Sequence, residues 1–357
     1  MLLLIDPRPT VLHWCTVDND TFHPYHCNWS DMHQSIIDSI EDIEQIEAVA
    51  YTLHHGGRTI RDTTSRLTVE TLEELQGTAQ SFFDLIEPTI AVAEHWLKRL
   101  PETSHLLLSD TAFFSNLPTE AATYALPQTV CQQGIRRYGG YGLCHEWIWQ
   151  QAQQLLPLPA ERIISVYLGD HTNLAAIRNG VPLDTSLGFS PVEGILSATA
   201  CGDIDPTIIF HLHSAGASLA DINRSLMSEA GFTGLRQKKC SYLDLMRGKR
   251  DPNLASIRTV LHYQILKYIG AFISLLGGAD AIAFVSQHLN ESTSFIHDIC
   301  CQLEFLGIRF PKNFPQQNEP YVTGENTLTY IMALEYSPWR VLAGNVYRFL
   351  QGGVSNG

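Results

Sequence analysis

Histidine and aspartate residues that could transfer protons or bind metal ions are spread along this sequence of 357 residues. Asp170 and His171 are adjacent, so the carboxylate could raise the pKa of the imidazole and orient its ring as a general base. Imidazole and carboxylate groups are also ordinary ligands of zinc and iron. The other histidines with this potential are His13, His54, His55 and His145, and none has the short H-x-x-x-H spacing of a metal-binding helix. We therefore predict no metal site.

The composition of the chain restricts its possible binding partners and its cellular location. A formal net charge of −14 argues against a nucleic-acid surface and against binding to an anionic membrane. The eight cysteines are scattered without a C-x-x-C motif, which favours reduced thiols and a cytoplasmic protein. The first residues form a short apolar segment broken by prolines, so we expect neither a signal peptide nor an apolar run long enough to span a membrane.

The elements that must position these residues alternate between strands and helices. Apolar segments predict strands at 2–5, 12–17, 48–53, 105–109, 162–168, 173–178, 279–285 and 327–333. Helical spacing predicts helices at 31–47, 68–76, 89–100, 219–230, 257–276, 291–306 and 339–349. A strand hairpin leads into helices twice, near residue 2 and near residue 162, as in a duplicated α/β fold.

Several motifs resemble those of the acetate kinase family along almost the whole chain. They read SDTAFF at 109–114, GIRRYGGYGLCHEW at 134–147, YLGDHTNLAAIRNGVPLDTSLGFSPVEG at 167–194, CGDIDP at 201–206 and YIGAFISLLGGADAIAFVSQHLNES at 268–292. The resemblance implies the two-lobed sugar kinase/Hsp70/actin (actin-like ATPase) fold with a cleft between the lobes, and a homodimer. It places lobe I at 1–111 plus 339–357 and lobe II at 112–338.

The resemblance also identifies positions where the family's chemical groups are replaced. The phosphate-binding turn N-x-G-S-S-S-x-K becomes Asp6, Pro9, Val11 and His13 at its key positions. Proline has no N–H to offer a phosphate, and an aspartate repels an anion. Two arginines of the family become Thr52 and Ala200, and its phosphoryl-stabilising histidine becomes Tyr141.

Asp110 is the only retained group among those that face the transferred phosphoryl in the family. It could be a catalytic relic, or it could end a strand and cap the next segment. Asp170 and His171 replace the Asn and Gly of the H-L-G-N-G motif. With Asp110 and Tyr141 they would form the cleft's candidate constellation. Arg136 and Arg137 remain as a possible phosphate clamp or as structural residues.

Replacements also affect the nucleotide end of the cleft. The glycines of G-I-G-E-N are lost around Gln287 and Leu289, and the adenine-flanking Asp and Arg become Ser241 and Leu243. Bulky side chains would fill the space that glycine leaves for a ligand. The segment YSPWRVL at 336–342 contains no acid in place of the family's Mg²⁺-supporting motif.

These losses predict that ordinary acetate kinase activity is absent, because one arginine aimed at a transferred phosphoryl is worth roughly 10³–10⁵ in rate. The first expectation is a pseudoenzyme that binds or regulates a partner enzyme and needs no cofactor. A second is a transferase whose cleft serves another carboxylate or acyl phosphate. A third is a plain acetate kinase that uses ATP and Mg²⁺.

Overall fold

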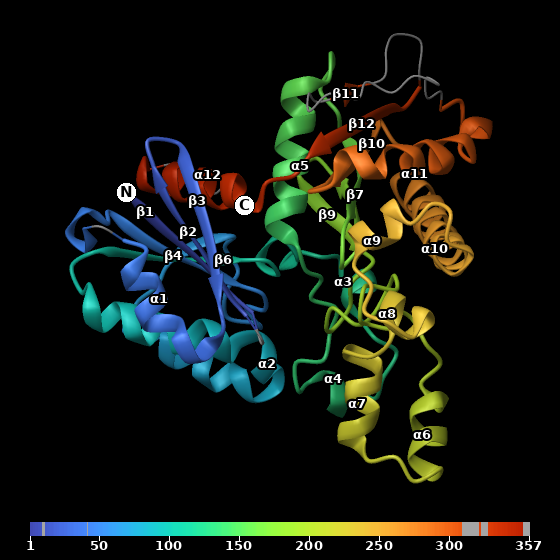
Figure 1. Cartoon of the computed structure of the whole chain (residues 1–357). Coiled ribbons are helices and arrows are strands. Elements are labelled where there is room, and N and C mark those ends of the chain that lie inside the picture. Colours follow the sequence, from blue (N-terminus) through green and yellow to red (C-terminus); the bar gives the residue numbers. More distant parts are fainter. Residues whose placement is uncertain (9–10, 41, 309–320, 323–327, 353–357) are drawn as a thin grey trace. The chain divides into compact units, whose positions relative to one another are not determined.

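The computed structural model describes residues 1–8, 11–40, 42–308, 321–322 and 328–352 (Figure 1). The chain divides into two compact units. Unit 1 contains Met1–Ser115, Gly140–Cys144 and Ser337–Gly357, and unit 2 contains Asn116–Gly139 and His145–Tyr336. Residues 140–144, which the sequence analysis assigned to lobe II, cluster with unit 1. This short segment carries Tyr141 and Gly142.

Unit 1 is built on a mixed sheet of six strands in the order β3-β2-β1-β4-β6-β5. The strands are β1 (Leu2–Pro7), β2 (Leu12–Asp18), β3 (Thr21–Cys27), β4 (Ala48–Leu53), β5 (Thr64–Arg66) and β6 (Ser104–Ser109). Strands β1, β4 and β6 run parallel, whereas β2 and β3 form antiparallel pairs beside β1. All residues of β1 and β4 are buried, as expected for central strands covered on both faces.

The helices of unit 1 differ from the sequence predictions in two places. They are α1 (Met32–Asp38), α2 (Val69–Arg99) and α12 (Pro338–Leu350), with short 3₁₀ turns η1 (Trp29–Asp31), η2 (Ile43–Gln45) and η3 (Ala112–Phe114). The predicted helix over 31–47 was wrong, because α1 ends at Asp38. There the Ser39 hydroxyl donates to the Ile36 carbonyl and accepts from the Trp14 indole, which ties the chain to β2.

The two helices predicted at 68–76 and 89–100 are a single helix of 31 residues with Pro88 inside it. A proline inside a helix costs roughly 3 kcal/mol because it removes one hydrogen bond and crowds the preceding turn. Ile86 and Ile90 flank the proline and are almost fully buried. Their packing in the core of unit 1 favours continuing the helix despite that cost.

Unit 2 repeats the strand succession of unit 1. Its six-stranded sheet has the order β11-β12-β10-β7-β8-β9. The strands are β7 (Arg162–Leu168), β8 (Asn173–Arg178), β9 (Val181–Thr185), β10 (Ala281–Ser286), β11 (Tyr321–Val322) and β12 (Tyr330–Glu335). The order β9-β8-β7-β10-β12 matches β3-β2-β1-β4-β6, with two antiparallel partners on one side and two parallel partners on the other. The predicted duplication is therefore present in the topology.

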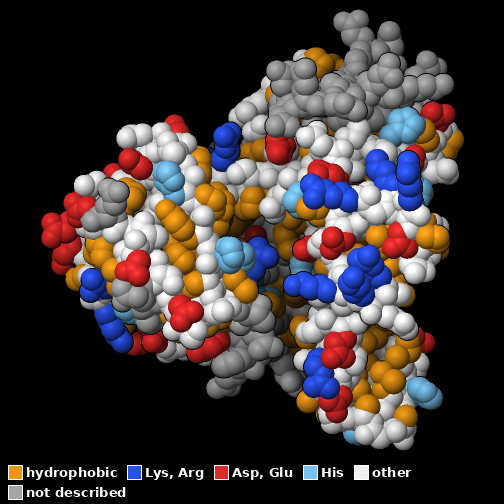
Figure 2. Space-filling view, viewed as in Figure 1, with side chains coloured by type: hydrophobic (Ala, Val, Ile, Leu, Met, Phe, Trp, Pro, Cys, Tyr) orange, Lys and Arg blue, Asp and Glu red, His pale blue; other side chains and the backbone are white. Residues whose placement is uncertain are grey.

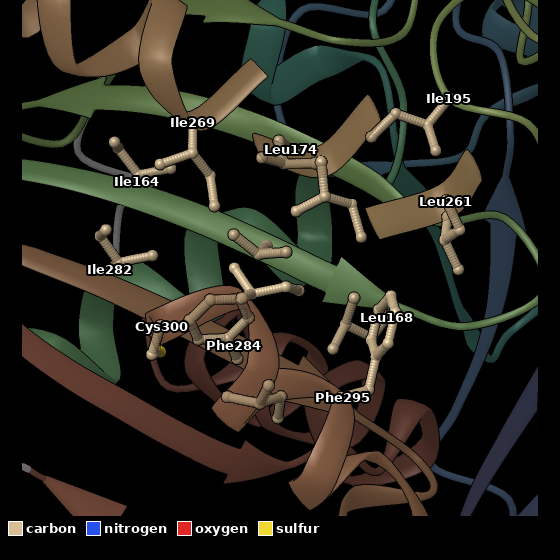
Figure 3. Packing of buried hydrophobic residues seen from close by; sticks show 14 of the residues in the cluster. Ile164, Leu168, Leu174, Ile195, Leu261, Ile269, Ile282, Phe284, Phe295 and Cys300 are labelled. Atoms are coloured by element: carbon tan, nitrogen blue, oxygen red, sulfur yellow. The ribbon is translucent and has the colours of Figure 1, made fainter. Parts of the chain in front are cut away.

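The helices of unit 2 lie partly against this sheet and partly away from it, with α6 (Thr207–Ser214) and α7 (Leu219–Met227) in the distant part (Figure 1). They are α3 (Thr119–Ala122), α4 (Gln128–Cys131), α5 (Gly142–Leu155, whose first turn belongs to unit 1), α6 (Thr207–Ser214), α7 (Leu219–Met227), α8 (Gly231–Arg236), α9 (Tyr242–Arg247), α10 (Pro252–Leu276) and α11 (Leu289–Cys301), with η4 (Glu304–Leu306). Figure 3 shows Leu261 and Ile269 of α10 packed against Ile164 and Leu174 of the sheet.

The expectation that no apolar run could span a membrane needs correction at α10. This helix of 25 residues is long and apolar enough to cross a membrane by length and composition. Seven of its side chains are nevertheless buried at helical spacing, from Leu254 to Leu276, in the hydrophobic core of unit 2. Such a buried stripe is typical of the central helix of a folded domain.

Candidate active site

Three polar residues stand at the same end of the parallel strands of unit 1. Asp6 lies near the end of β1, His54 follows β4, and Asp110 follows β6. The strands are adjacent in the sheet, with Ile5 opposite Tyr51 and Leu53 opposite Ser109. Since the carboxyl ends of parallel strands meet at one edge of a sheet, the fold brings these three side chains together.

The imidazole of His54 lies between the two carboxylates. Its Nδ1 is 3.1 Å from Oδ2 of Asp110, and its Nε2 is 2.9 Å from Oδ1 of Asp6. On the other side of Asp6, Nε and Nη2 of Arg8 each lie 2.9 Å from Oδ2. The Asp6 and Asp110 side chains are only 12% and 13% exposed. The result is a chain of alternating charge, Arg8–Asp6–His54–Asp110.

The electrostatics of the site depends on this alternation. Burial alone would raise the pKa of Asp6, but the charges of Arg8 and His54 outweigh that effect and hold it well below its ordinary value. Burial alone would lower the pKa of His54, yet Asp6 and Asp110 together raise it to about 9. His54 is therefore an imidazolium at neutral pH. Its Nδ1–H donates a hydrogen bond to Asp110, whereas the contact of Nε2 with Asp6 Oδ1 is an ion pair without hydrogen-bond geometry.

The backbone around Asp110 is fixed by neighbouring segments. The Asp110 N–H donates to the carbonyl of Leu53, and its carbonyl accepts the N–H of Gly142 at 2.8 Å. A Cβ atom on Gly142 would lie 2.2 Å from that carbonyl oxygen, so only glycine fits there. The preceding Tyr141 adopts a left-handed conformation with φ of 57°. For a bulky side chain this conformation stores roughly 1–3 kcal/mol of strain and is often found at functional sites.

The positions of unit 1 that the resemblance marked as replaced have the following contacts. His13 on β2 is directly opposite Asp6. Burial is the main reason that its pKa is lowered, so His13 adds no positive charge. Thr52 is buried in β4, and its carbonyl accepts the hydroxyl of Thr89. Val11 accepts the backbone N–H of Arg8 at 3.2 Å. Pro9 lies outside the described residues.

Asp170 and His171 belong to unit 2, in the turn between β7 and β8 and not on a strand. Oδ1 of Asp170 accepts the N–H of Tyr242 at 2.6 Å, at the beginning of α9. The His171 carbonyl accepts the side-chain amide of Asn173. The structure thus brings Asp110 together with His54 and Asp6 inside unit 1. A joint site of Asp110 and Tyr141 with Asp170 and His171 stays a prediction.

The other charged and polar residues singled out in unit 2 have structural partners. Arg137 donates to the Glu193 carboxylate at 2.7 Å and to the carbonyls of Thr185 and Leu187, which favours its structural role over a phosphate clamp. The Nε of Arg136 donates to the carbonyl of Arg137. Ala200 is buried and its N–H donates to the hydroxyl of Ser197.

Two of the scattered histidines are also buried and have hydrogen-bond partners within the protein. The fully buried ring of His145 lies 2.6 Å from Ser165 Oγ and 2.6 Å from Asn173 Oδ1. Burial lowers its pKa to about 4, so it is neutral at physiological pH. His55 is buried and accepts the N–H of Gly57 at Nδ1. Within the described residues, no group of three or more His, Cys, Asp or Glu is placed to hold a metal ion.

The positions that the resemblance assigned to the nucleotide end have contacts within unit 2. Ser241 caps α9, accepting the N–H of Asp244 in a reciprocal capping box. Leu243 follows within the first turn of that helix. Leu289 begins α11 and belongs to the hydrophobic core, where it is 5% exposed. Gln287 reaches the hydroxyl of Tyr167 at 3.4 Å. The place of these residues at a nucleotide site stays a prediction.

Comparison with known proteins places the chain in a family. The model of the acetokinase family matches residues 21–336. The chain belongs to the acetokinase family. An acetate kinase of Cronobacter sakazakii is 36% identical over 267 residues, covering 71% of this chain but only 65% of that relative, which is just under two thirds. A propionate kinase of Citrobacter rodentium is 31% identical over 316 residues, covering 87% of this chain and 78% of the relative.

Solved structures of this family have the same fold. The acetate kinase of Entamoeba histolytica superposes with a TM-score of 0.87 over 98% of this chain and 99% of its own, at 22% identity. That of Porphyromonas gingivalis gives a TM-score of 0.85 at the same identity and the same coverage of both chains. The expected two-sheet, actin-like α/β fold is therefore confirmed.

The sequence analysis named Asp6, His54 and Asp110 but did not place Asp6 beside the other two. The signal that could have joined them is a polar residue at or just after each of three buried strands, 2–5, 48–53 and 105–109. In an α/β sheet with these strands adjacent and parallel, such residues converge at one edge. Arg8 lies two residues after Asp6 and completes the network.

Proposed function

We propose that this member of the acetokinase family has given up ATP:carboxylate phosphotransfer and acts by binding, as a partner or regulator of another protein. The observation that carries this proposal is the sharing of His54 by Asp6 and Asp110. The two carboxylates are balanced by Arg8 and His54, so these four charges sum to zero. A transferred phosphoryl group needs an excess of positive charge around it.

The buried environments of two replaced arginine positions support the same proposal. Thr52 and Ala200 are 5% and 3% exposed. Thr52 accepts a hydrogen bond at its backbone carbonyl, and the N–H of Ala200 donates one, so neither supplies a cation. Loss of one phosphoryl-binding arginine lowers turnover by roughly 10³–10⁵, and losses within one site do not simply add.

A thermal-shift experiment with ATP and Mg²⁺ tests this proposal at the level of binding. A ligand that binds the folded state raises the melting temperature. We expect no shift for this chain, under conditions in which the Cronobacter sakazakii acetate kinase is stabilised. A saturable shift at micromolar ATP would contradict the proposal.

The comparisons favour a second candidate function, the acetate or propionate kinase activity named for the relatives. Its support is the 36% identity to an acetate kinase and the presence of Asp110 within the SDTAFF motif. In this case ATP and Mg²⁺ would be substrates despite the replacements. Formation of acyl phosphate from acetate or propionate distinguishes it from the first candidate.

A third candidate is a transferase that uses the altered site for another carboxylate or acyl phosphate. The proximity of His54 to Asp110 supports it, since a carboxylate beside an imidazole can move protons. Its proposed residues are Asp110, Tyr141, Asp170 and His171. His171→Ala and Tyr141→Phe, assayed in the native process, test it. Loss of function in variants that still fold would exclude an inert scaffold, and full function in both would exclude this transferase.

A further inference from the structure

The contacts of Asp6 have the form of a protein bound to a small carboxylate. Arg8 approaches Oδ2 with Nε and Nη2, both at 2.9 Å, and His54 approaches Oδ1 with Nε2 at 2.9 Å. Both oxygens of the carboxylate thus face a cation. The Nε–H of Arg8 donates a hydrogen bond to Oδ2, and the contact of His54 Nε2 with Oδ1 is an ion pair without hydrogen-bond geometry. Guanidinium and imidazolium groups are cations with which proteins hold carboxylate ligands.

We infer that Arg8 and His54 form a binding site for a small carboxylate, and that the side chain of Asp6 occupies this site in the folded chain. Asp6 is a tethered ligand, because its backbone is held in β1 between β2 and β4. A tethered group competes at a high effective concentration with any free ion. The site is therefore closed to free carboxylates in the native protein.

Charge balance determines how the site should respond to removal of the tethered ligand. With Asp6, the group Arg8, Asp6, His54 and Asp110 is neutral, since two positive charges face two negative ones. Without the Asp6 carboxylate the same group carries one positive charge, with the His54 side chain 23% exposed and the Arg8 side chain 46% exposed. Two cations directed at the vacated space should attract one monovalent anion into it.

Formate is the ligand that best fits the space left by the Asp6 carboxylate. Asp6→Ala keeps Cβ and removes a carboxylate, and formate is that carboxylate as a free ion. We expect formate to raise the melting temperature of Asp6→Ala in a saturable way, by at least ~2 °C at high occupancy, relative to chloride at equal ionic strength. The unchanged protein should respond to formate and chloride alike.

Two variants serve as matched controls. Asp6→Asn removes the charge but fills the space, so it should bind formate about tenfold or more weakly than Asp6→Ala in calorimetry. Asp6→Ala with Arg8→Gln keeps the space but loses a cation, so the formate response should disappear. These measurements involve neither ATP nor turnover, so their outcome is independent of the proposed function.

A missing formate response would overturn the inference. If Asp6→Ala folds and responds to formate no more than the unchanged protein, Arg8 and His54 do not form a carboxylate site. If Asp6→Ala does not fold in chloride, its refolding yield replaces the melting temperature. A yield that formate restores supports the site, and a yield that formate leaves at the chloride level contradicts it.

Discussion

His54 Nδ1 lies 3.1 Å from Asp110 Oδ2, although the two residues are 56 positions apart in the sequence. The pKa of His54 is raised to about 9, so its ring gives the Asp110 carboxylate a cationic partner at neutral pH. An Asp110 held in this way is neutralised before any ligand arrives. This relationship links the fold of unit 1 to the proposed loss of phosphotransfer.

The stability of the protein should depend on pH through His54. Its pKa is raised from 6.5 to about 9 in the folded state, so its contribution is complete below pH 6.5 and is lost as the pH rises through 9. We expect the difference in unfolding free energy between the unchanged protein and His54→Gln to shrink by roughly 2–3 kcal/mol over this range. Urea unfolding at pH 6 and 9.5 measures it.

His145→Gln is the control for this pH dependence. The pKa of His145 is lowered to about 4 in the folded chain, so the folded residue is neutral at both pH values. Its contribution to stability should rise by less than about 1 kcal/mol from pH 6 to 9.5, as the unfolded chain loses its proton. A His54 contribution that likewise does not fall would show that this ring is not an imidazolium between two carboxylates.

The contact between Gly142 and Asp110 predicts a large effect from one methyl group. In Gly142→Ala the new Cβ would meet the Asp110 carbonyl at 2.2 Å, so the variant should lose more than about 2 kcal/mol of stability. Gly270→Ala is the matched control, because nothing lies within 4 Å of its Cβ position in helix α10. It should gain roughly 0.5–1 kcal/mol. Equal effects in both variants would contradict the described packing at Asp110.

We propose that the chain forms a homodimer through unit 2, as the family resemblance implied. Exposed apolar side chains support this; they are Ile208 and Phe210 on α6, Leu219 on α7, and Val260, Tyr263 and Leu275 on α10. Figure 2 shows hydrophobic side chains gathered over the α6 and α7 end of unit 2. Light scattering should give about twice the 39.9 kDa of one chain.

The control for dimerisation uses two exposed positions of unit 2. Tyr263→Lys on α10 should weaken the dimer, whereas Leu158→Lys, which lies beyond the end of α5, should not. A mass near that of one chain at micromolar concentration in the unchanged protein would exclude the homodimer.

Much of the fold could be predicted from the sequence because strands leave a local signature. The strand at 48–53 and the hairpin of 162–168 with 173–178 have the predicted bounds. The predicted helix bounds were wrong where long-range contacts determine the ends of a helix. Two helices were predicted at 68–76 and 89–100, but buried neighbours of Pro88 keep α2 continuous. The hydrogen bond between Trp14 and Ser39 holds the chain where α1 ends early.

The candidate site could be predicted only in part. The motif resemblance named Asp110, Thr52 and Ala200, and their family roles stay predictions. The pairing of Asp110 with His54 and Asp6 depends on strand order, which no local pattern contains. Sequence adjacency suggested Asp170 with His171, but the Asp170 carboxylate accepts a backbone hydrogen bond at the start of α9.

Acyl phosphate formation tests the central claim most directly. The purified chain is supplied with ATP, Mg²⁺ and acetate or propionate, and acyl phosphate is trapped as its hydroxamate. The acetate kinase of Cronobacter sakazakii is assayed in parallel under the same conditions. We predict turnover at least ~10³-fold below that relative, and no further loss in Asp110→Asn. Turnover within about tenfold of the relative, abolished by Asp110→Asn, would show that phosphotransfer survives and would contradict the account.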